Sequence, residues 1–311
     1  MAAVIKTVNL TKRYGTLVAL SNLNLEINEG DCFGFIGPNG AGKTTTIKIL
    51  ATLLQPTWGE ARICDLVVGY QSRQIRPLIG YVPDYFGAYE DMVVQEYLEF
   101  FAASYNIHSH ARQKVVDDVL TLTDLGYKRD SLVDGLSRGM KQRLSIARVL
   151  LHDPKVLFLD EPAGNLDPRA RIELRELLKE LRRMGKTILI SSHILPELAD
   201  LCNTCGIIER GELLYSGPVA DIVRRAKTGT VLHVNVVKGH EKAAALLSQN
   251  PHVVNVVPNN SHLEVSLRDG QTDYTFIPQL LLQNGFQLTL LKEEEVNLET
   301  AFMRLTKGIV Q

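Results

Sequence analysis

The segment from residue 37 to residue 44 constrains the fold of this chain more than any other feature of its sequence. It reads Gly-Pro-Asn-Gly-Ala-Gly-Lys-Thr and fits the pattern G-x-x-x-x-G-K-[S/T] at every fixed position. Residues 31–36 before it have the apolar character of a buried strand, and residues 43–53 after it have a helical pattern. A strand, a glycine-rich turn and a helix form the structural context that this pattern requires.

The residue types of this loop suit the binding of phosphate. Glycines let the backbone curl so that several N–H groups point at phosphate oxygens, Lys43 places a cation by the β- and γ-phosphates, and the Thr44 hydroxyl ligates Mg²⁺. A mere glycine turn is the alternative, but a chance match at all fixed positions is rare. We therefore predict a binding site for a nucleoside triphosphate with Mg²⁺. Its contact residues are Gly37, Pro38, Asn39, Gly40, Ala41, Gly42, Lys43, Thr44 and Thr45.

Two adjacent carboxylates, Asp160 and Glu161, follow an apolar run at residues 156–159. A buried strand can carry an acid only at its end, and in doubly wound sheets ligands sit at the carboxyl ends of the strands. We assign Asp160 to Mg²⁺ and Glu161 to orienting and deprotonating an attacking water. A solvated strand end is the alternative, and the phosphate-binding pattern upstream weighs against it.

The order of apolar segments predicts an α/β fold. Two uniformly apolar runs, residues 155–159 and 187–190, are separated by a charged amphipathic helix at residues 169–184. Strands without alternation, linked by a helix, are typical of a parallel sheet covered on both faces. Further strands are expected at residues 4–10 and 23–27, and further helices at residues 92–125 and from Ser137 onward.

The pattern changes near Gly217, and this change predicts a second domain. From residue 230 the order is strand, helix, strand, strand, helix, strand, and a closing helix is expected at residues 298–305. A length of 311 residues agrees with two domains. We place the boundary after residue 218, so that a small α+β domain spans residues 219–311.

Charge and hydropathy exclude several classes of protein. Lys and Arg number 34 against 35 Asp and Glu, which gives no electrostatic reason to propose nucleic acid as a partner. No apolar run approaches the roughly 18 to 20 residues of a membrane-spanning helix, and residues 1–10 lack the apolar core of a secretory signal. We therefore expect a cytoplasmic protein. If it serves a membrane process, another chain must supply the membrane segments.

The cysteines and histidines give weaker signals. Cys202 and Cys205 form a lone C-x-x-C, and no second pair or histidine lies at the spacing of a zinc site. Free thiols, buried or half-buried, are therefore favoured over metal binding. His108 and His110 flank one serine in a polar stretch, and a solvated loop accounts for both.

Residues 136–144, with the sequence Leu-Ser-Arg-Gly-Met-Lys-Gln-Arg-Leu, resemble the signature motif of the ATP-binding subunits of ABC transporters. The resemblance covers about residues 4–217 and includes the phosphate-binding loop and the acidic strand. It also includes a D-loop at residues 164–167 and a switch histidine, His193. The chain is most similar to the ABC-2, multidrug-exporter-like class, with a single cassette and a C-terminal accessory domain.

The resemblance implies a fold and a mechanism. The expected fold is a P-loop cassette at residues 1–218, with a mixed sheet core, an antiparallel β subdomain and a helical subdomain at about residues 85–150. Two copies would pack head to tail around two ATP molecules, each held between the loop of one copy and the signature of the other. ATP hydrolysis would drive a separate membrane-spanning permease, in the direction of export. The protein would then lie on the inner face of the cell membrane through that permease.

The resemblance also assigns roles to single residues. Lys43, Glu161 and His193 would act in catalysis, with His193 contacting the γ-phosphate. Ser137 is a good helix N-cap candidate, and the N–H groups after it would face the γ-phosphate across the dimer interface. The remaining expected ligands are Gly139 and Asp167 at the interface, Tyr14 against the adenine, and Thr44, Asp160 and Asp84 at Mg²⁺. An ordinary half-buried tyrosine is the alternative for Tyr14.

The chain departs from the family pattern at four positions. Arg138 and Met140 replace the usual Gly and Gln of the signature, whereas Ser137 and Gly139 remain. Asn165 stands where glycine is common, and asparagine tolerates left-handed backbone angles. Asp84 stands where the family usually has Gln, so a carboxylate would lie near the γ-phosphate, and it can still bind Mg²⁺.

Two further alternatives remain open. A soluble ABC-type ATPase acting on nucleic acid or ribosomes is the competing function, although this chain has one cassette, no heptad run and no basic tract. The C-terminal domain would extend the dimer contact or regulate activity, and the alternative is an addition that only stabilises the fold.

Overall fold

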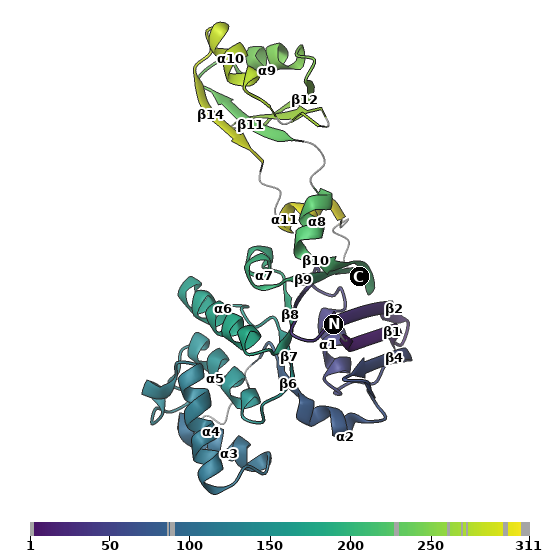
Figure 1. The fold of residues 1–311 in the computed structure, drawn as a ribbon, viewed down its shortest axis with the longest axis vertical. Coiled ribbons are helices and arrows are strands. Elements are labelled where there is room, and N and C mark those ends of the chain that lie inside the picture. Colours follow the sequence, from purple (N-terminus) through teal and green to yellow (C-terminus); the bar gives the residue numbers. More distant parts are fainter. Residues whose placement is uncertain are drawn as a thin grey trace. The chain divides into compact units, whose positions relative to one another are not determined.

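The computed structural model describes residues 3–85, 87, 91–226, 230–259, 262–268, 270–271, 273–294 and 298–305. The chain divides after Val219 into two compact units, and Ala220–Arg304 forms the second. Figure 1 shows both units as ribbons coloured along the sequence. Each unit has a hydrophobic core of its own, and the two core clusters share no residue.

A six-stranded sheet in the order β10-β9-β3-β8-β7-β6 forms the centre of the first unit. All neighbouring strands are parallel except β10, which pairs with β9 as an antiparallel hairpin. The two apolar runs that predicted a parallel sheet lie in β7 and β8. Both strands are buried at every residue and pair with each other in parallel, so this prediction is confirmed. The strands are β3 (Cys32–Ile36), β6 (Ile79–Val82), β7 (Val156–Asp160), β8 (Thr187–Ser192), β9 (Thr204–Glu209) and β10 (Glu212–Pro218).

Helices and a second sheet cover this central sheet. In Figure 1, α5 and α6 lie on one side of it, and α1 and a four-stranded sheet lie on the other. The core cluster on the second side joins Phe33, Phe158 and Leu189 of the central strands to Ile47 of α1. The helices are α1 (Lys43–Leu50), α5 (Arg138–Leu150), α6 (Pro168–Arg183) and α7 (Leu195–Leu201).

The four-stranded sheet has the order β2-β1-β4-β5 and is antiparallel throughout. Its first two strands are longer than the predicted ranges 4–10 and 23–27. Register shifts between β1 and β2 interrupt the alternation of buried and exposed residues, so the period-2 pattern identifies only part of each strand. The strands are β1 (Ala3–Tyr14), β2 (Leu17–Asn28), β4 (Trp58–Ile63) and β5 (Leu66–Val67), followed by two short helices, α2 (Ser72–Ile75) and η1 (Arg76–Leu78).

The predicted helix at residues 92–125 is two helices, α3 (Val94–Ser104) and α4 (Ser109–Leu122). The backbone is left-handed at Asn106, between the two helices, and at Ser109, the first residue of α4, with φ of 61° and 50°. A continuous α-helix cannot run through such residues. His108 and His110 are exposed, but His110 lies in the first turn of α4 and not in the expected loop. A single turn, η2 (Gly126–Lys128), follows α4, and α1 also ends three residues earlier than expected.

The second unit has the predicted order of strands and helices. Its antiparallel sheet has the order β12-β13-β11-β14, and Leu232, Val234 and Val236 of β11 pack with residues of α9 and α10. Side chains alternate across a strand, so the residues between these three lie on the opposite face of the sheet. The elements are α8 (Val219–Ala226), β11 (Val231–Val236), α9 (His240–Ser248), β12 (Val253–Pro258), β13 (Leu263–Leu267), α10 (Phe276–Gln283), β14 (Leu288–Glu293) and α11 (Leu298–Leu305).

All four cysteines are free thiols, as expected from their spacing. Cys32, Cys202 and Cys205 are buried, and Cys64 is half-buried. The sulfur atoms of Cys32 and Cys202 lie 3.6 Å apart, so Cys202 at the end of α7 lies against Cys32 of β3. Within the described ranges, no helix is both long enough and apolar enough to cross a lipid bilayer.

Replacing Phe158 by alanine tests the central role of β7 in the core. Phe158 is fully buried between the two covering layers, so Phe158→Ala should lower the free energy of unfolding of the first unit by about 3–5 kcal/mol. The matched control is Tyr70→Ala, because Tyr70 is 93% exposed and its loss should change stability by less than about 0.5 kcal/mol. Denaturant unfolding followed by circular dichroism measures both, and equal effects would contradict the described burial.

Candidate active site

The glycine-rich loop joins the end of β3 to the start of α1. Two of its positions require glycine because the backbone of another segment lies very close to each of them. A Cβ on Gly37 would collide with the carbonyl oxygen of Ile208, and one on Gly42 would lie 2.7 Å from that of Ala19. Gly42 also has a φ of 109°, which L side chains rarely adopt. The loop therefore has its curled shape because these positions carry no side chain.

Lys43 is held at the centre of this loop. It is only 6% exposed, and its Nζ donates to the carbonyl oxygens of Gly37 at 2.7 Å and Pro38 at 3.2 Å. The same Nζ lies 3.4 Å from Oε1 of Glu161. Asn39 and Gly40 at the tip of the loop are exposed. An anion can therefore approach the backbone of this part of the loop.

Asp160 connects three elements at the carboxyl edge of the sheet. Its Oδ1 accepts a hydrogen bond from Thr44 of α1 at 3.1 Å and one from Ser191 of β8 at 2.7 Å. Burial raises the pKa of Asp160 above its ordinary value, the two hydroxyl donors lower it, and the charges of Asp84 and Glu161 raise it further. The carboxylate predicted to hold Mg²⁺ thus lies directly against the predicted Mg²⁺-binding hydroxyl.

Glu161 brings the predicted catalytic residues together. Its Oε2 lies 2.8 Å from Nδ1 of His193, and its Oε1 faces Lys43. Its backbone is left-handed, with a φ of 48°, and its N–H donates to Oγ and O of Ser191 at 3.0 and 3.2 Å. Such backbone angles in a non-glycine residue are held by the surrounding structure and cluster at functional sites.

Asp84 follows β6 at the same edge of the sheet, and its influence here is electrostatic. Its charge raises the pKa of Asp160, and it contributes with burial and Asp160 to raising the pKa of Tyr81 to about 12. Asp84 also lines a hollow together with Arg138 of α5 and Asn165. Asp84 therefore acts on Asp160 through its charge, and its role as a Mg²⁺ ligand stays a prediction.

The signature residues form a separate group. Ser137 caps α5, because its Oγ accepts from the N–H of Met140 at 3.3 Å, and Asp167 caps α6 by accepting from Ala170 N–H at 2.9 Å. Ser137, Gly139 and Asp167 line one hollow, and no residue of the glycine-rich loop lines it. Within one chain, the two halves of the predicted site lie apart.

Gly139 has a packing role that its motif does not reveal. A Cβ at this position would lie 2.6 Å from the Cβ of Ala170, so α5 and the first turn of α6 touch here without an intervening side chain. Asn165, two residues before the helix cap at Asp167, has a φ of 59°, as expected for a left-handed position in this loop. Tyr14 lies at the end of β1 and is 47% exposed, with Nζ of Lys12 5.2 Å from the centroid of its ring.

Sequence reasoning missed Ser191. Its hydroxyl donates to Asp160 and accepts from the N–H of Glu161, so it positions both members of the acid pair. The available signal was its place at the end of the apolar run before His193, because the carboxyl ends of adjacent parallel strands share one edge of a sheet.

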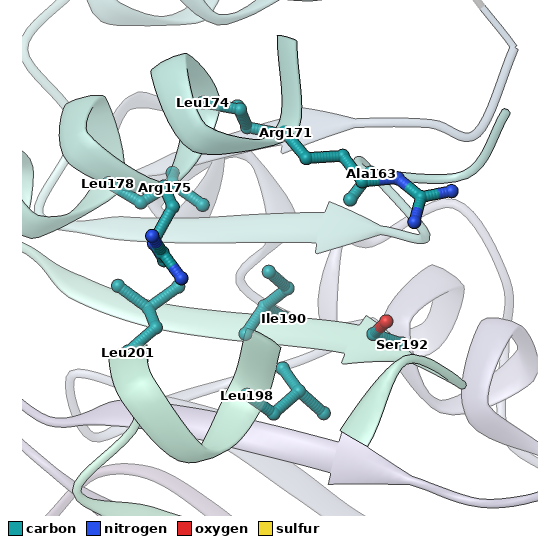
Figure 2. Close-up of a pocket in the computed structure, with 9 residues that line it drawn as sticks. All are labelled: Ala163, Arg171, Leu174, Arg175, Leu178, Ile190, Ser192, Leu198 and Leu201. Atoms are coloured by element: carbon teal, nitrogen blue, oxygen red, sulfur yellow. The ribbon is translucent and has the colours of Figure 1, made fainter. Parts of the chain in front are cut away.

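A different hollow, shown in Figure 2, lies between α6, β8 and α7. Its walls are largely apolar, and Figure 2 shows the leucine side chains of α6 and α7 pointing into it with Ser192 at one side. None of the predicted ligand-binding residues lines this hollow, so it is part of the packing between the helices and the sheet.

Replacing Asp160 by asparagine tests the effect of its burial. The folded-state pKa is raised, so the folded state binds the proton more tightly and stability falls as pH rises through that window. The amide side chain would keep an oxygen for Thr44 and Ser191 without the buried charge. Asp160→Asn should therefore raise the melting temperature at pH 7, and the gain should vanish as pH falls below the ordinary value of 3.8.

Thermal unfolding between pH 7 and pH 3 measures this difference. The matched control is Asp118→Asn, because Asp118 is exposed on α4 and its neutralisation should leave the melting temperature unchanged. A lower melting temperature of Asp160→Asn at pH 7 would contradict the burial penalty.

Comparison with known proteins identifies the family of this chain. A family model described as ABC transporter matches residues 20–164. The bacitracin transport ATP-binding protein BcrA of Bacillus licheniformis is 35% identical over 99% of both chains. The Nod factor export ATP-binding protein I of Burkholderia orbicola is 40% identical over 67% of this chain and 69% of its own.

A solved structure, the dimer of a bacterial ABC transporter cassette, superimposes with a TM-score of 0.63 and 28% identity. It covers 69% of this chain and 98% of that cassette. The match to BcrA extends over the whole chain, whereas the match to this structure spans a length close to that of the first unit. This chain belongs to the family of ABC transporter ATP-binding proteins, which hydrolyse ATP to drive transport.

Proposed function

We propose that two copies of this chain bind two ATP molecules head to tail and that hydrolysis drives a separate permease in the direction of export. The observation that carries this proposal is the division of the site within one chain. Lys43, Glu161 and His193 meet at the sheet edge, whereas Ser137 and Gly139 line another hollow. A second copy supplies the missing half.

The sheet edge suits Mg²⁺. The Thr44 hydroxyl and the Asp160 carboxylate lie within hydrogen-bond distance of each other, and both offer the oxygen ligands that Mg²⁺ prefers. Thr44, Asp160 and Asp84 would hold the ion. The ion would supply charge neutralisation for the β- and γ-phosphates.

Glu161 is placed to act as the general base. Its carboxylate lies between Lys43 and His193, and the hydrogen bonds from its N–H to Ser191 fix its backbone. When the γ-phosphate approaches Lys43, it competes with Glu161 for the ammonium group. The freed carboxylate can then orient a water and accept its proton, while His193 contacts the phosphate oxygens.

The start of α5 suits the γ-phosphate of the partner's ATP. α5 has 13 residues, so the unpaired N–H groups and partial positive charge at its N-terminus can receive an anion. Asp167 would bridge the two sites. Cassettes of this family dimerise, and the similar dimeric structure supports the same arrangement here.

Family membership supports the remaining parts of the proposal. Proteins of this family pair with membrane permease subunits, and a relative with 40% identity carries the name of an export protein. We propose that this chain lies on the inner face of the cell membrane through such a permease. The formal charge of −1 gives no support to the alternative, an ATPase acting on nucleic acid.

Blocking the general base should trap the closed dimer. In Glu161→Gln the water is not activated, so turnover should fall by about 10²–10⁴-fold while ATP binding persists. Light scattering after size exclusion should then report a dimer with ATP and Mg²⁺, and phosphate release should report the lost activity.

Two variants control this experiment. Glu180→Gln changes an exposed glutamate of α6 and should leave turnover and oligomeric state unchanged. Lys43→Ala should abolish nucleotide binding and therefore the dimer. The proposal fails if Glu161→Gln stays monomeric at saturating ATP or turns over normally.

We further propose that the second unit regulates activity or extends the dimer contact. Its core is independent of the first, so deletion of residues 225–311 should leave ATP binding intact. Dimer formation or the turnover rate should change, as measured by light scattering and phosphate release. Unchanged values of both would favour a unit that only adds stability.

A further inference from the structure

The second unit carries two imidazoles and a carboxylate on one face of its sheet. The antiparallel register places His233 of β11 directly opposite Glu264 of β13, and His262 lies two residues before Glu264 on the same face. The rings of His233 and His262 have their centroids 4.4 Å apart, and Nε2 of His262 lies 3.6 Å from Oε1 of Glu264. Neighbouring residues Leu232, Leu263 and Val265 point to the core instead.

These three side chains are close enough to share one ion. One ligand atom from each lies within 4.8 Å of the other two, and no other such group occurs in the part of the chain that the structure describes. Ligands bound at about 2.1 Å in a tetrahedron lie about 3.4 Å apart. Side-chain rotations that move each atom by less than about 1 Å would therefore complete the site.

We propose that His233, His262 and Glu264 bind a divalent transition-metal ion and that Zn²⁺ is the ion that fits best. Two imidazole nitrogens with one carboxylate oxygen form a donor set that suits Zn²⁺ and disfavours Mg²⁺ and Ca²⁺, which take oxygen ligands. All three residues are half-buried, so their side chains are partly ordered and still reachable from solvent. Three protein ligands leave a fourth position for water or another donor.

A neighbouring side chain orients the carboxylate. Nδ2 of Asn259 donates to Oε1 of Glu264 at 3.0 Å, and the N–H of Asn259 donates to the carbonyl oxygen of His262 at 2.8 Å. Partners of this kind fix the direction of metal ligands. Asn259 thus contacts two of the three ligands and holds them in their relative positions.

The positive charge of Lys292, on the other side of His233, opposes the binding of a metal ion. In the register of β11 and β14, Lys292 lies directly opposite His233, so Glu264, His233 and Lys292 form one row across three strands. The positive charge of Lys292 repels a divalent ion, and the negative charge of Glu264 offsets it. Removing each charge should therefore change affinity in opposite directions.

Titration of the full-length, nucleotide-free chain with Zn²⁺ against a chromophoric chelator tests the site. The unmodified chain should bind one more Zn²⁺ per chain than His233→Gln, and His262→Gln and Glu264→Gln should each weaken this binding by about tenfold or more. Lys292→Gln should strengthen it severalfold. Co²⁺ in place of Zn²⁺ should give the visible absorption of a four-coordinate ion only where the site is intact.

Matched variants separate this site from other metal-binding groups of the chain. His252→Gln removes an exposed histidine of the same unit, and Glu161→Gln alters the ATP site, so both should leave the extra Zn²⁺ in place. Circular dichroism of each variant without metal should match that of the unmodified chain, because the ligands lie outside the core. Equal stoichiometry and affinity in the unmodified chain, His233→Gln and His262→Gln would overturn the proposal.

Discussion

The buried carboxylate of Asp160 is the contact on which the active-site edge depends. It accepts hydrogen bonds from the hydroxyl groups of Thr44 and Ser191, and so it joins the helix after the glycine-rich loop to two central strands. Burial opposes the charge of this carboxylate, so its hydroxyl partners are needed to stabilise it. The fold has thus gathered at this edge the oxygen atoms that the proposed Mg²⁺ site needs, and the buried charge lowers stability.

Glu161 extends this arrangement from binding to chemistry. The backbone bends into the left-handed region immediately after the strand ends, and this bend turns the carboxylate toward Lys43 and His193. The hydroxyl of Ser191 holds both the metal-side acid and the backbone of the adjacent base. One serine thus fixes the relative positions of the two acids, to which we assign different roles because their surroundings differ.

The sequence predicted those parts in which a short segment carries its own chemistry. The glycine-rich loop, the acid pair and the cap at Ser137 could be identified because each depends on residues within a few positions. The break between α3 and α4 was missed, although residues 108–110 are polar, because it depends on the left-handed backbone at Asn106 and Ser109. The full lengths of β1 and β2 escaped prediction for a similar reason, since register shifts interrupt the alternation of side chains.

Contacts between distant segments were the least accessible to sequence reasoning. His233 and Glu264 become neighbours only through the register of β11 and β13, and Cys32 meets Cys202 only because the end of α7 packs against β3. The packing of Gly139 on Ala170 is likewise invisible in a motif that explains this glycine by its nearness to phosphate.

That contact between α5 and α6 has a mechanical consequence. The methyl group of Ala170 packs directly against Gly139, which has no side chain. The starts of the two helices therefore cannot move closer together without displacing each other. Ser137 and Asp167 cap these two helices, so a push that moves one cap toward the other helix is passed on through this contact.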